Sequence, residues 1–378
     1  MFDLVLKGGR VVDPAQGVDA TLDVAFADGK VAEVGPDLGS GKDTRDVAGL
    51  LVVPGLIDLH THVYWGGTSL GVDPDAYAKG SGLTTLIDAG SAGPGNLKGF
   101  RRHVIEPAEV RILPFLNISF AGIFALSKEI NVGECRDLAL INPRVCLDVA
   151  KADADLVVGI KVRVGGGASG ASGIAPMEMA LEVAEHAGLP LMTHLDKPPP
   201  NRSDLMPRLR KGDILTHCFR PFPNTPVAPG GEIRDDVLAA RERGVIFDIG
   251  HGKGSFGYET AMAMLKQGFL PDVISSDIHV VSIEGPAYDL LTTMSKFLAL
   301  GVALPEVIRA TTINPARAVR LRDRGALRPG LLGDATVLTM EKGRFVFEDV
   351  LGEKLNAEQR LACRGIVLNG RWWHGSVD

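Results

Sequence analysis

The alternation of apolar strand-like runs with amphipathic helical stretches most constrains how this chain can fold. From Val52 to about Leu321, short apolar runs are separated by stretches with helical periodicity, such as MEMALEVAEHAG from Met177 to Gly188. This alternation is typical of parallel sheets, because a helix returns the chain to the start of each next strand. The strand-like runs are VVPGLIDLHTH, TTLIDAG, RILPFLNIS, ADLVVGIKVRV, LPLMTHLD, GDILTHCF, GVIFDIGHG and PDVISSDIH. Eight such runs predict an α/β fold with a (β/α)8 TIM-like barrel.

The two ends of the chain have a different pattern. Residues 1–53 contain short β segments, in which Gly8-Gly9 and Asp28-Gly29 are typical hairpin turns. Strand character returns after Arg322 in GDATVLTM, RFVFEDV and GIVLNGRWWHG. We therefore predict that residues 1–53 and 323–378 form one small β-sandwich domain beside a catalytic, metal-binding barrel at residues 54–322.

Length, charge and cysteine content narrow the class of protein. With 378 residues, 45% of them hydrophobic, the chain can bury a large core. The net charge of -6 and the absence of a basic tract argue against nucleic acid as a partner and favour a small molecule. We see no leader-like start and no apolar run of roughly 20 residues, and four cysteines without a CxxC pair. These features predict a cytoplasmic protein that does not engage a membrane; self-association stays open.

Polar residues close several of the apolar runs. In TIM-like barrels the active site lies at the carboxyl ends of the strands, so such residues converge on one place. His60 and His62 are two residues apart at the end of the first run and therefore share one face of the strand. The full set is His60, His62, Lys161, His194, His217 and Asp277. Each alone has an ordinary structural explanation, but together their donors suit Zn(II).

Lys161 differs from the other five because an ammonium group cannot bind a metal. Burial disfavours the charged form of a lysine, and the neutral amine can take up carbon dioxide to give a carbamate. A carbamate has one negative charge and two oxygens, so a carboxylated Lys161 could bridge two cations. An ion-paired lysine would be the preferred explanation if the histidines were absent.

The motifs DLHTH, GIKVR, MTH, LTHCF and SSDIH, in this order, resemble the binuclear branch of the amidohydrolase superfamily. The later text TINPARAVRL and GALRPGLLGDATVL is also similar to that superfamily, so the resemblance covers the whole chain. It implies a metal-dependent hydrolase of amides and esters with two divalent ions. The implied ligands are His60, His62, carboxylated Lys161, His194, His217 and Asp277. We expect attack by a metal-bridging hydroxide, with Asp277 as the catalytic residue that carries the proton.

The residues around these motifs bear on the substrate. Dihydroorotases usually place an arginine after the HxH pair, whereas Val63-Tyr64-Trp65 follow His62 here. The combination HCFRP, DIGHGKGSF and SSDIH resembles a deacetylase group that is often labelled dihydroorotase or adenine deaminase. That resemblance implies removal of an acyl group, acetyl above all, from a small carboxylate-bearing molecule such as an acetylated 2-hydroxy acid or an N-acetyl amino acid. Candidate substrate-binding residues are Arg163, His279, Arg220, Lys253 and Tyr64, with Arg163 the first choice for the carboxylate.

Other interpretations stay open at this point. A cyclic amide hydrolase of the dihydroorotase or hydantoinase type would use the same ligands. The run GKGSFG, Gly252 to Gly257, matches the GxGxxG pattern of dinucleotide sites, but a glycine turn at the barrel mouth is the better explanation. A non-catalytic scaffold would be expected to lose ligands, and all six positions are filled. Cys218 alternates with His217 and is predicted to pack in the core.

Overall fold

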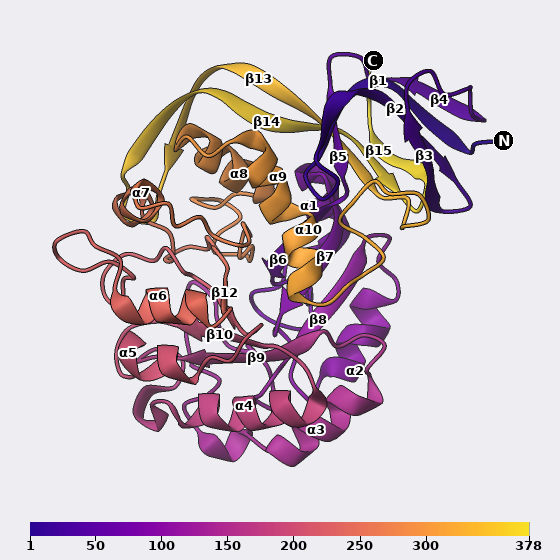
Figure 1. Ribbon diagram of the computed structural model, residues 1–378. Coiled ribbons are helices and arrows are strands. Elements are labelled where there is room, and N and C mark those ends of the chain that lie inside the picture. The colour runs from indigo at the N-terminus through magenta and orange to yellow at the C-terminus, as the bar shows by residue number, and fades with distance from the viewer. Residues whose placement is uncertain (378) are drawn as a thin grey trace.

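The computed structural model describes residues 1–377, and it has a mixed α/β fold around a curled parallel sheet (Figure 1). Neighbouring strands of this sheet are parallel and follow one another in chain order, from β6 to β12. The strands are β6 (Leu56–Thr61), β7 (Leu83–Ala89), β8 (Arg111–Asn117), β9 (Gly159–Val164), β10 (Leu191–Leu195), β11 (Ile214–Leu215) and β12 (Ile246–Phe247). All polar residues at their carboxyl ends therefore lie along one edge of the sheet.

The run PDVISSDIH, which the sequence predicts as an eighth strand, is not a regular strand. It makes one parallel bridge to each edge of the sheet, from Val273 to Asp248 and from Ile278 to Thr61. Asp277 has a φ of 49°, in the left-handed region that strand residues do not adopt. The segment therefore joins β12 to β6 while its backbone turns at Asp277, which corrects the expected regular strand.

Helices connect the parallel strands and cover the outside of the curled sheet (Figure 1). The predicted helix at Met177–Gly188 is present as α4, which has Pro176 at its start and ends at Gly188 in the left-handed conformation. The helices are α1 (Pro74–Ser81), α2 (Leu97–Phe100), α3 (Pro143–Ala152), α4 (Ala175–Ala187), α5 (Arg202–Leu205), α6 (Asp235–Glu242), α7 (Tyr258–Lys266), α8 (Leu290–Ala299), α9 (Leu304–Thr311) and α10 (Ile313–Ala318).

Strands from both ends of the chain share a second sheet, beside the first (Figure 1). Its order is β15-β14-β13-β5-β1-β2-β3, and β4 pairs with β1. The strands are β1 (Leu4–Asp13), β2 (Val18–Ala27), β3 (Lys30–Gly35), β4 (Asp43–Asp46), β5 (Leu51–Pro54), β13 (Ala335–Glu348), β14 (Lys354–Leu368) and β15 (Arg371–Gly375). The chain passes from this sheet into the parallel one at Gly55.

The two predicted glycine turns have different outcomes. Asp28 and Gly29 connect β2 and β3 with positive φ values of 51° and 75°, as a tight hairpin turn requires. Gly8 and Gly9 instead lie inside β1, where the pairing with β2 shifts between Leu6 and Gly9. The Gly8-Gly9 pair therefore lies at a β-bulge, where glycine is also common within strands.

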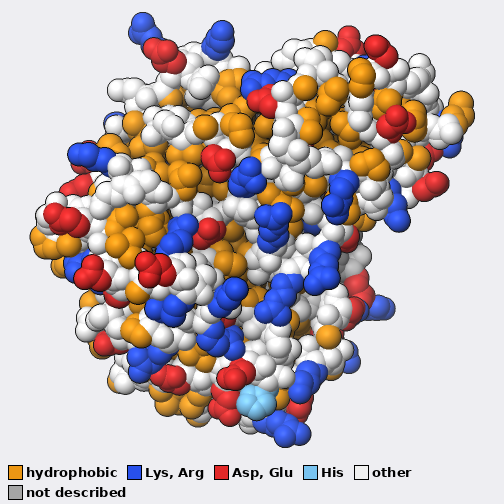
Figure 2. All heavy atoms as spheres, viewed as in Figure 1, with side chains coloured by type: hydrophobic (Ala, Val, Ile, Leu, Met, Phe, Trp, Pro, Cys, Tyr) orange, Lys and Arg blue, Asp and Glu red, His pale blue; other side chains and the backbone are white. Residues whose placement is uncertain are grey.

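The core and surface agree with the composition. Cys218 is buried in the main hydrophobic core, as predicted. Figure 2 shows acidic and basic side chains scattered together over one face of the molecule. Within residues 1–377, no helix has both the length and the apolar character that a membrane span requires.

Candidate metal centre

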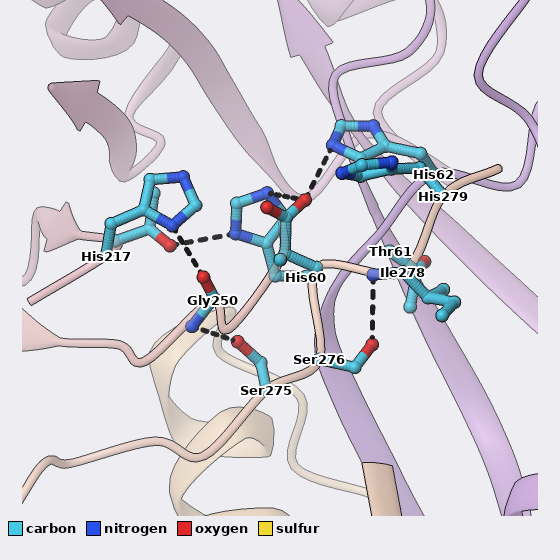
Figure 3. Close-up of polar contacts among 12 residues, drawn as sticks. His60, Thr61, His62, His217, Gly250, Ser275, Ser276, Ile278 and His279 are labelled. Atoms are coloured by element: carbon cyan, nitrogen blue, oxygen red, sulfur yellow. Dashed lines mark hydrogen bonds and ion pairs between the residues drawn. The ribbon is translucent and has the colours of Figure 1, made fainter. Parts of the chain in front are cut away.

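Five of the predicted ligands line one cavity of about 310 Å³ at the carboxyl ends of the parallel strands. They reach it from β6 and the residue that follows it, from β10, from the residues after β11, and from the segment that joins β12 to β6. Figure 3 shows several of these side chains directed toward one another. The predicted ligands in the cavity wall are His60, His62, His194, His217 and Asp277.

His60, His62 and Asp277 form the tightest group. Oδ1 of Asp277 lies 3.3 Å from Nε2 of His60 and 3.3 Å from Nε2 of His62. One donor atom from each residue lies within 4.8 Å of the others, a spacing that could hold one metal ion. The backbone N–H of Asp277 donates to the carbonyl of His60 at 2.7 Å, so the turn at Asp277 aligns its carboxylate with the two imidazoles.

His194 and His217 form a second group beside the first. Their rings are 4.5 Å apart, centre to centre, and the His217 ring is 5.1 Å from the His60 ring. Nδ1 of His217 lies 2.6 Å from the carbonyl oxygen of Gly250, which assigns the proton to Nδ1 and leaves Nε2 free to bind a metal. Nε2 of His194 is buried without a hydrogen-bond partner, and its nearest recorded acidic oxygen is Oδ2 of Asp196 at 3.9 Å. Both rings thus keep a nitrogen available.

Lys161 is near enough to both groups to affect the pKa values of their members, although it does not line the cavity. It is completely buried, and its Nζ has no hydrogen-bond partner. Burial lowers the pKa of Lys161 to about 7, despite the nearby Asp277. A fully buried amine without a hydrogen-bond partner is costly in a folded protein. The surroundings of Lys161 therefore suit a lysine whose amine takes up a negatively charged group and binds a further partner.

The ionisation of these residues also suits a metal. Burial is the main cause that holds the pKa values of His60, His194 and His217 well below the usual range, so these rings are neutral near pH 7. Burial lowers the pKa of His62 to about 3 and raises the pKa of Asp277 to about 6. Neutral imidazoles beside a carboxylate are the donor set of a divalent transition metal.

Residues outside the predicted set orient these imidazoles. Nδ1 of His60 lies 2.8 Å from Oγ1 of Thr216, which donates to Asp248 at 2.7 Å. Nδ1 of His62 lies 2.9 Å from Oγ of Ser91. Asp248 closes the apolar run GVIFD and Thr216 stands inside the motif LTHCF, whereas Ser91 carries no distinctive pattern in the sequence. Such contacts fix ring orientation and the protonated nitrogen.

A second buried network supports the two segments that carry the ligands. The hydroxyl of Tyr77 donates to Asp58 at 2.9 Å, and Ser276 donates to the same carboxylate through its Oγ and, at 3.0 Å, through its backbone N–H. Asp58 precedes His60 on β6, and Ser276 precedes Asp277. Asp58 therefore ties β6 to the turn that presents Asp277.

Four of the five predicted substrate-binding residues line the same cavity, namely Arg163, Arg220, Lys253 and His279. Arg163 is largely buried, and its Nε lies 3.2 Å from Oε1 of Glu134, a buried carboxylate outside the predicted site residues. Lys253 donates to the carbonyl of Gly285 at 3.1 Å. The cavity thus contains three cationic side chains at different depths.

Tyr64 is the exception among the predicted substrate-binding residues. Its ring stacks on Phe100 with ring centres 4.5 Å apart, and its hydroxyl donates to the carbonyl of Asn96 at 3.3 Å. Tyr64 is buried and is not part of the cavity wall, so its packing does not support the expected substrate contact, which stays a prediction. The run GKGSFG forms the loop between β12 and α7, and Lys253 to Ser255 line the cavity.

Three known proteins are similar to this chain over most of its length. A deacetylase of Agrobacterium fabrum is 36% identical over 343 residues, 90% of this chain and 84% of the relative. The crystal structure of an adenine deaminase is 31% identical with a TM-score of 0.93, and covers 99% of this chain and 100% of its own. The crystal structure of a dihydroorotase is 32% identical with a TM-score of 0.91, covering 100% of both chains. No protein-family model matches the sequence.

Proposed function

This chain is a hydrolase of the amidohydrolase superfamily and belongs to its deacetylase group, and from this premise we propose that it is a metal-dependent deacetylase. The proposed substrate is a small carboxylate-bearing ester or amide, such as an acetylated 2-hydroxy acid or an N-acetyl amino acid. The observation that carries the proposal is the close group of His60, His62 and Asp277, together with the buried Nζ of Lys161 and Nε2 of His194, neither of which has a hydrogen-bond partner.

We propose that the site holds two divalent cations, with Zn(II) as the metal. His60, His62 and Asp277 would hold one ion, and His194 and His217 the other. Lys161, carboxylated by carbon dioxide, would contribute an oxygen to each. The donor set supports this assignment, because neutral imidazoles and carboxylate oxygens suit Zn(II) and because the buried Lys161 amine has no protein partner.

The chemistry divides between the ions and the chain. When bound, the two cations supply Lewis acidity, which lowers the pKa of bound water and polarises the substrate carbonyl. Asp277 is placed to accept the proton of the attacking water and to return it to the leaving oxygen or nitrogen. Its position supports this role, because one carboxylate oxygen faces His60 and His62 while the residue lines the cavity.

The positively charged side chains that line the cavity support the proposal that the substrate carries a carboxylate. Arg163 is the first candidate because it is buried beside the ligand residues, and Arg220 and Lys253 add positive charge in the same cavity. His279 has a pKa lowered by burial to about 4, so near pH 7 it would act as a neutral hydrogen-bonding group. A cavity of this size fits a small acylated acid rather than a polymer.

Hydrolysis of a cyclic amide is the second candidate function. The 32% identity to a protein whose structure is described as a dihydroorotase favours it. Against it, His62 is followed by Val63, where dihydroorotases usually place an arginine.

The proposal is tested by a substrate panel. The purified protein, loaded with Zn(II) in bicarbonate buffer, is assayed against acetyl esters and N-acetyl amides of small acids in both configurations, with dihydroorotate and hydantoin in parallel. We expect acetate release from at least one carboxylate-bearing substrate. Turnover of the cyclic amides alone would replace the deacetylase with the second candidate.

We also propose that the shared sheet is a small β-sandwich domain made of residues 1–53 and 323–378, beside a barrel at residues 54–322. The shared strand order of the two ends and the change of sheet at Gly55 support these bounds.

A further inference from the structure

A second buried lysine, Lys296, lies outside the group of proposed ligands and does not line the cavity. Lys296, on α8, is completely buried, and its Nζ has three partners. It lies 2.8 Å from Nε2 of His251 and donates to the carbonyls of Pro286 and Glu348, each at 2.7 Å. His251 Nδ1 faces the carbonyl of Gly252 at 3.0 Å, so Nε2 is the nitrogen that accepts from the ammonium. All three ammonium protons are therefore used.

These three partners belong to three separate segments. His251 follows β12, Pro286 lies in the connection after Asp277, and Glu348 ends β13. The β13–β14 hairpin starts in the sheet of the chain ends and arches over α8 (Figure 1). Past Glu348, the backbone N–H of Val350 donates to the carbonyl of Phe256 at 3.2 Å. The hairpin end is thus docked on the loop that follows β12.

The segment held by Lys296 also contacts two of the proposed ligands. The carbonyl of Gly250 accepts from Nδ1 of His217, and the N–H of Gly250 donates to Oγ of Ser275 at 2.9 Å, as Figure 3 shows. Gly252 runs so close to Asp277 that a Cβ at this position would clash with Oδ2 of the carboxylate. Residues 250–252 therefore orient the His217 imidazole and lie against the Asp277 carboxylate.

We propose that Lys296 is a positioning residue that fixes residues 250–252 and, through them, the His217 imidazole and the Asp277 carboxylate. The end of the β13–β14 hairpin is then part of the scaffold of the site, although it comes from the other sheet. The physical reason is the cost of unpaired buried groups. Without the ammonium, His251 and two carbonyls would lack a donor in a buried place, and the segment would shift to find others. This inference rests on the proposed metal role of His217 and Asp277.

The test compares Lys296→Met with Met294→Ala in the full chain. Met294 is a fully buried core residue on the same helix and makes no polar contact with residues 250–252, so its truncation lowers stability without releasing the segment. Both variants and the parent are loaded with Co(II), whose visible absorption reports the ligand geometry. Metal affinity, melting temperature, kcat and KM are measured alongside.

We expect Lys296→Met to change the Co(II) spectrum and to weaken binding of one metal equivalent by about 10–100-fold, with a fall in kcat larger than any change in KM. Met294→Ala should keep the parent spectrum and affinity despite a lower melting temperature. An unchanged spectrum and affinity in Lys296→Met, or an equal change in Met294→Ala, would overturn the inference. A parent protein that binds no Co(II) would instead overturn the proposed metal function, and the inference with it.

Discussion

The backbone of Gly90 passes so close to Lys161 that a Cβ atom on the glycine would lie 2.6 Å from both Cβ and Cγ of the lysine. Gly90 also has a φ of 82°, which side chains of L-residues rarely adopt. Gly90→Ala should therefore displace Lys161 and weaken metal binding by about 10-fold or more, as loss of a supporting contact does at other metal sites. Metal titration followed by elemental analysis measures this.

The matched control for that variant is Gly80→Ala. Gly80 lies in α1, and a Cβ there would have open space around it. An alanine at this helical position should leave metal binding unchanged and raise stability slightly. Equal metal affinity in the two variants would show that the room left by Gly90 does not matter for Lys161.

Asp277→Asn separates the proton-carrying role of Asp277 from its role in the fold. The amide keeps the size of the carboxylate but cannot accept the proton of the attacking water, so we expect kcat to fall by about 10²–10⁴-fold. Metal content measured on the same sample distinguishes a lost proton acceptor from a lost ligand. A variant that keeps both metals and full turnover would contradict the role of Asp277.

The sequence alone predicts those parts of the site that depend on strand ends. Periodicity and strand-end position are sufficient to nominate His60, His194 and His217, because residues that close parallel strands meet at one edge. The same reasoning nominates Asp277, which does lie with His60 and His62, but it fails to predict the backbone there, which turns at a positive φ and forms two isolated bridges instead of a strand. It also fails at Gly8, where a glycine pair forms a bulge within β1.

The supporting contacts could not be predicted in the same way. Ser91 contacts His62 and belongs to no motif, whereas Thr216, which contacts His60, stands inside the motif LTHCF without any pattern that marks its role. Glu134 lies in a long connection between β8 and α3, and only the folded chain brings it beside Arg163. Hydroxyls and single acids are common along any chain, so their importance depends on contacts between residues that are distant in sequence.

Arg163→Met tests the choice of a carboxylate-bearing substrate. A hydrogen bond to a charged group contributes about 1.5–3 kcal/mol, so its loss should lower kcat/KM for a carboxylate substrate by roughly 10–100-fold. A neutral acetyl ester should be much less affected. Because Arg163→Met leaves Glu134 buried without its cation, the double variant with Glu134→Gln is assayed beside it. Equal losses for the charged and neutral substrates in both variants would remove the proposed carboxylate contact.

Tyr77→Phe should lower stability more than it lowers metal affinity. The variant removes one of the hydrogen bonds to the buried carboxylate of Asp58, at a cost of about 1–3 kcal/mol in the free energy of unfolding. Urea denaturation measures the change. Tyr288→Phe is the control, because that side chain is 48% exposed and its change should cost little. Two indistinguishable midpoints would show that the Asp58 network does not contribute to stability.

Acetate release, measured before and after metal removal, tests the claim that this chain is a metal-dependent deacetylase. The protein is treated with a chelator, dialysed, and restored with Zn(II) in bicarbonate, and acetate is quantified at each stage with a carboxylate-bearing acetyl substrate. We predict that release stops in the metal-free protein and returns when two equivalents of Zn(II) are bound per chain. Undiminished release from protein with less than one equivalent of metal, or no release from the fully loaded protein, would contradict the claim.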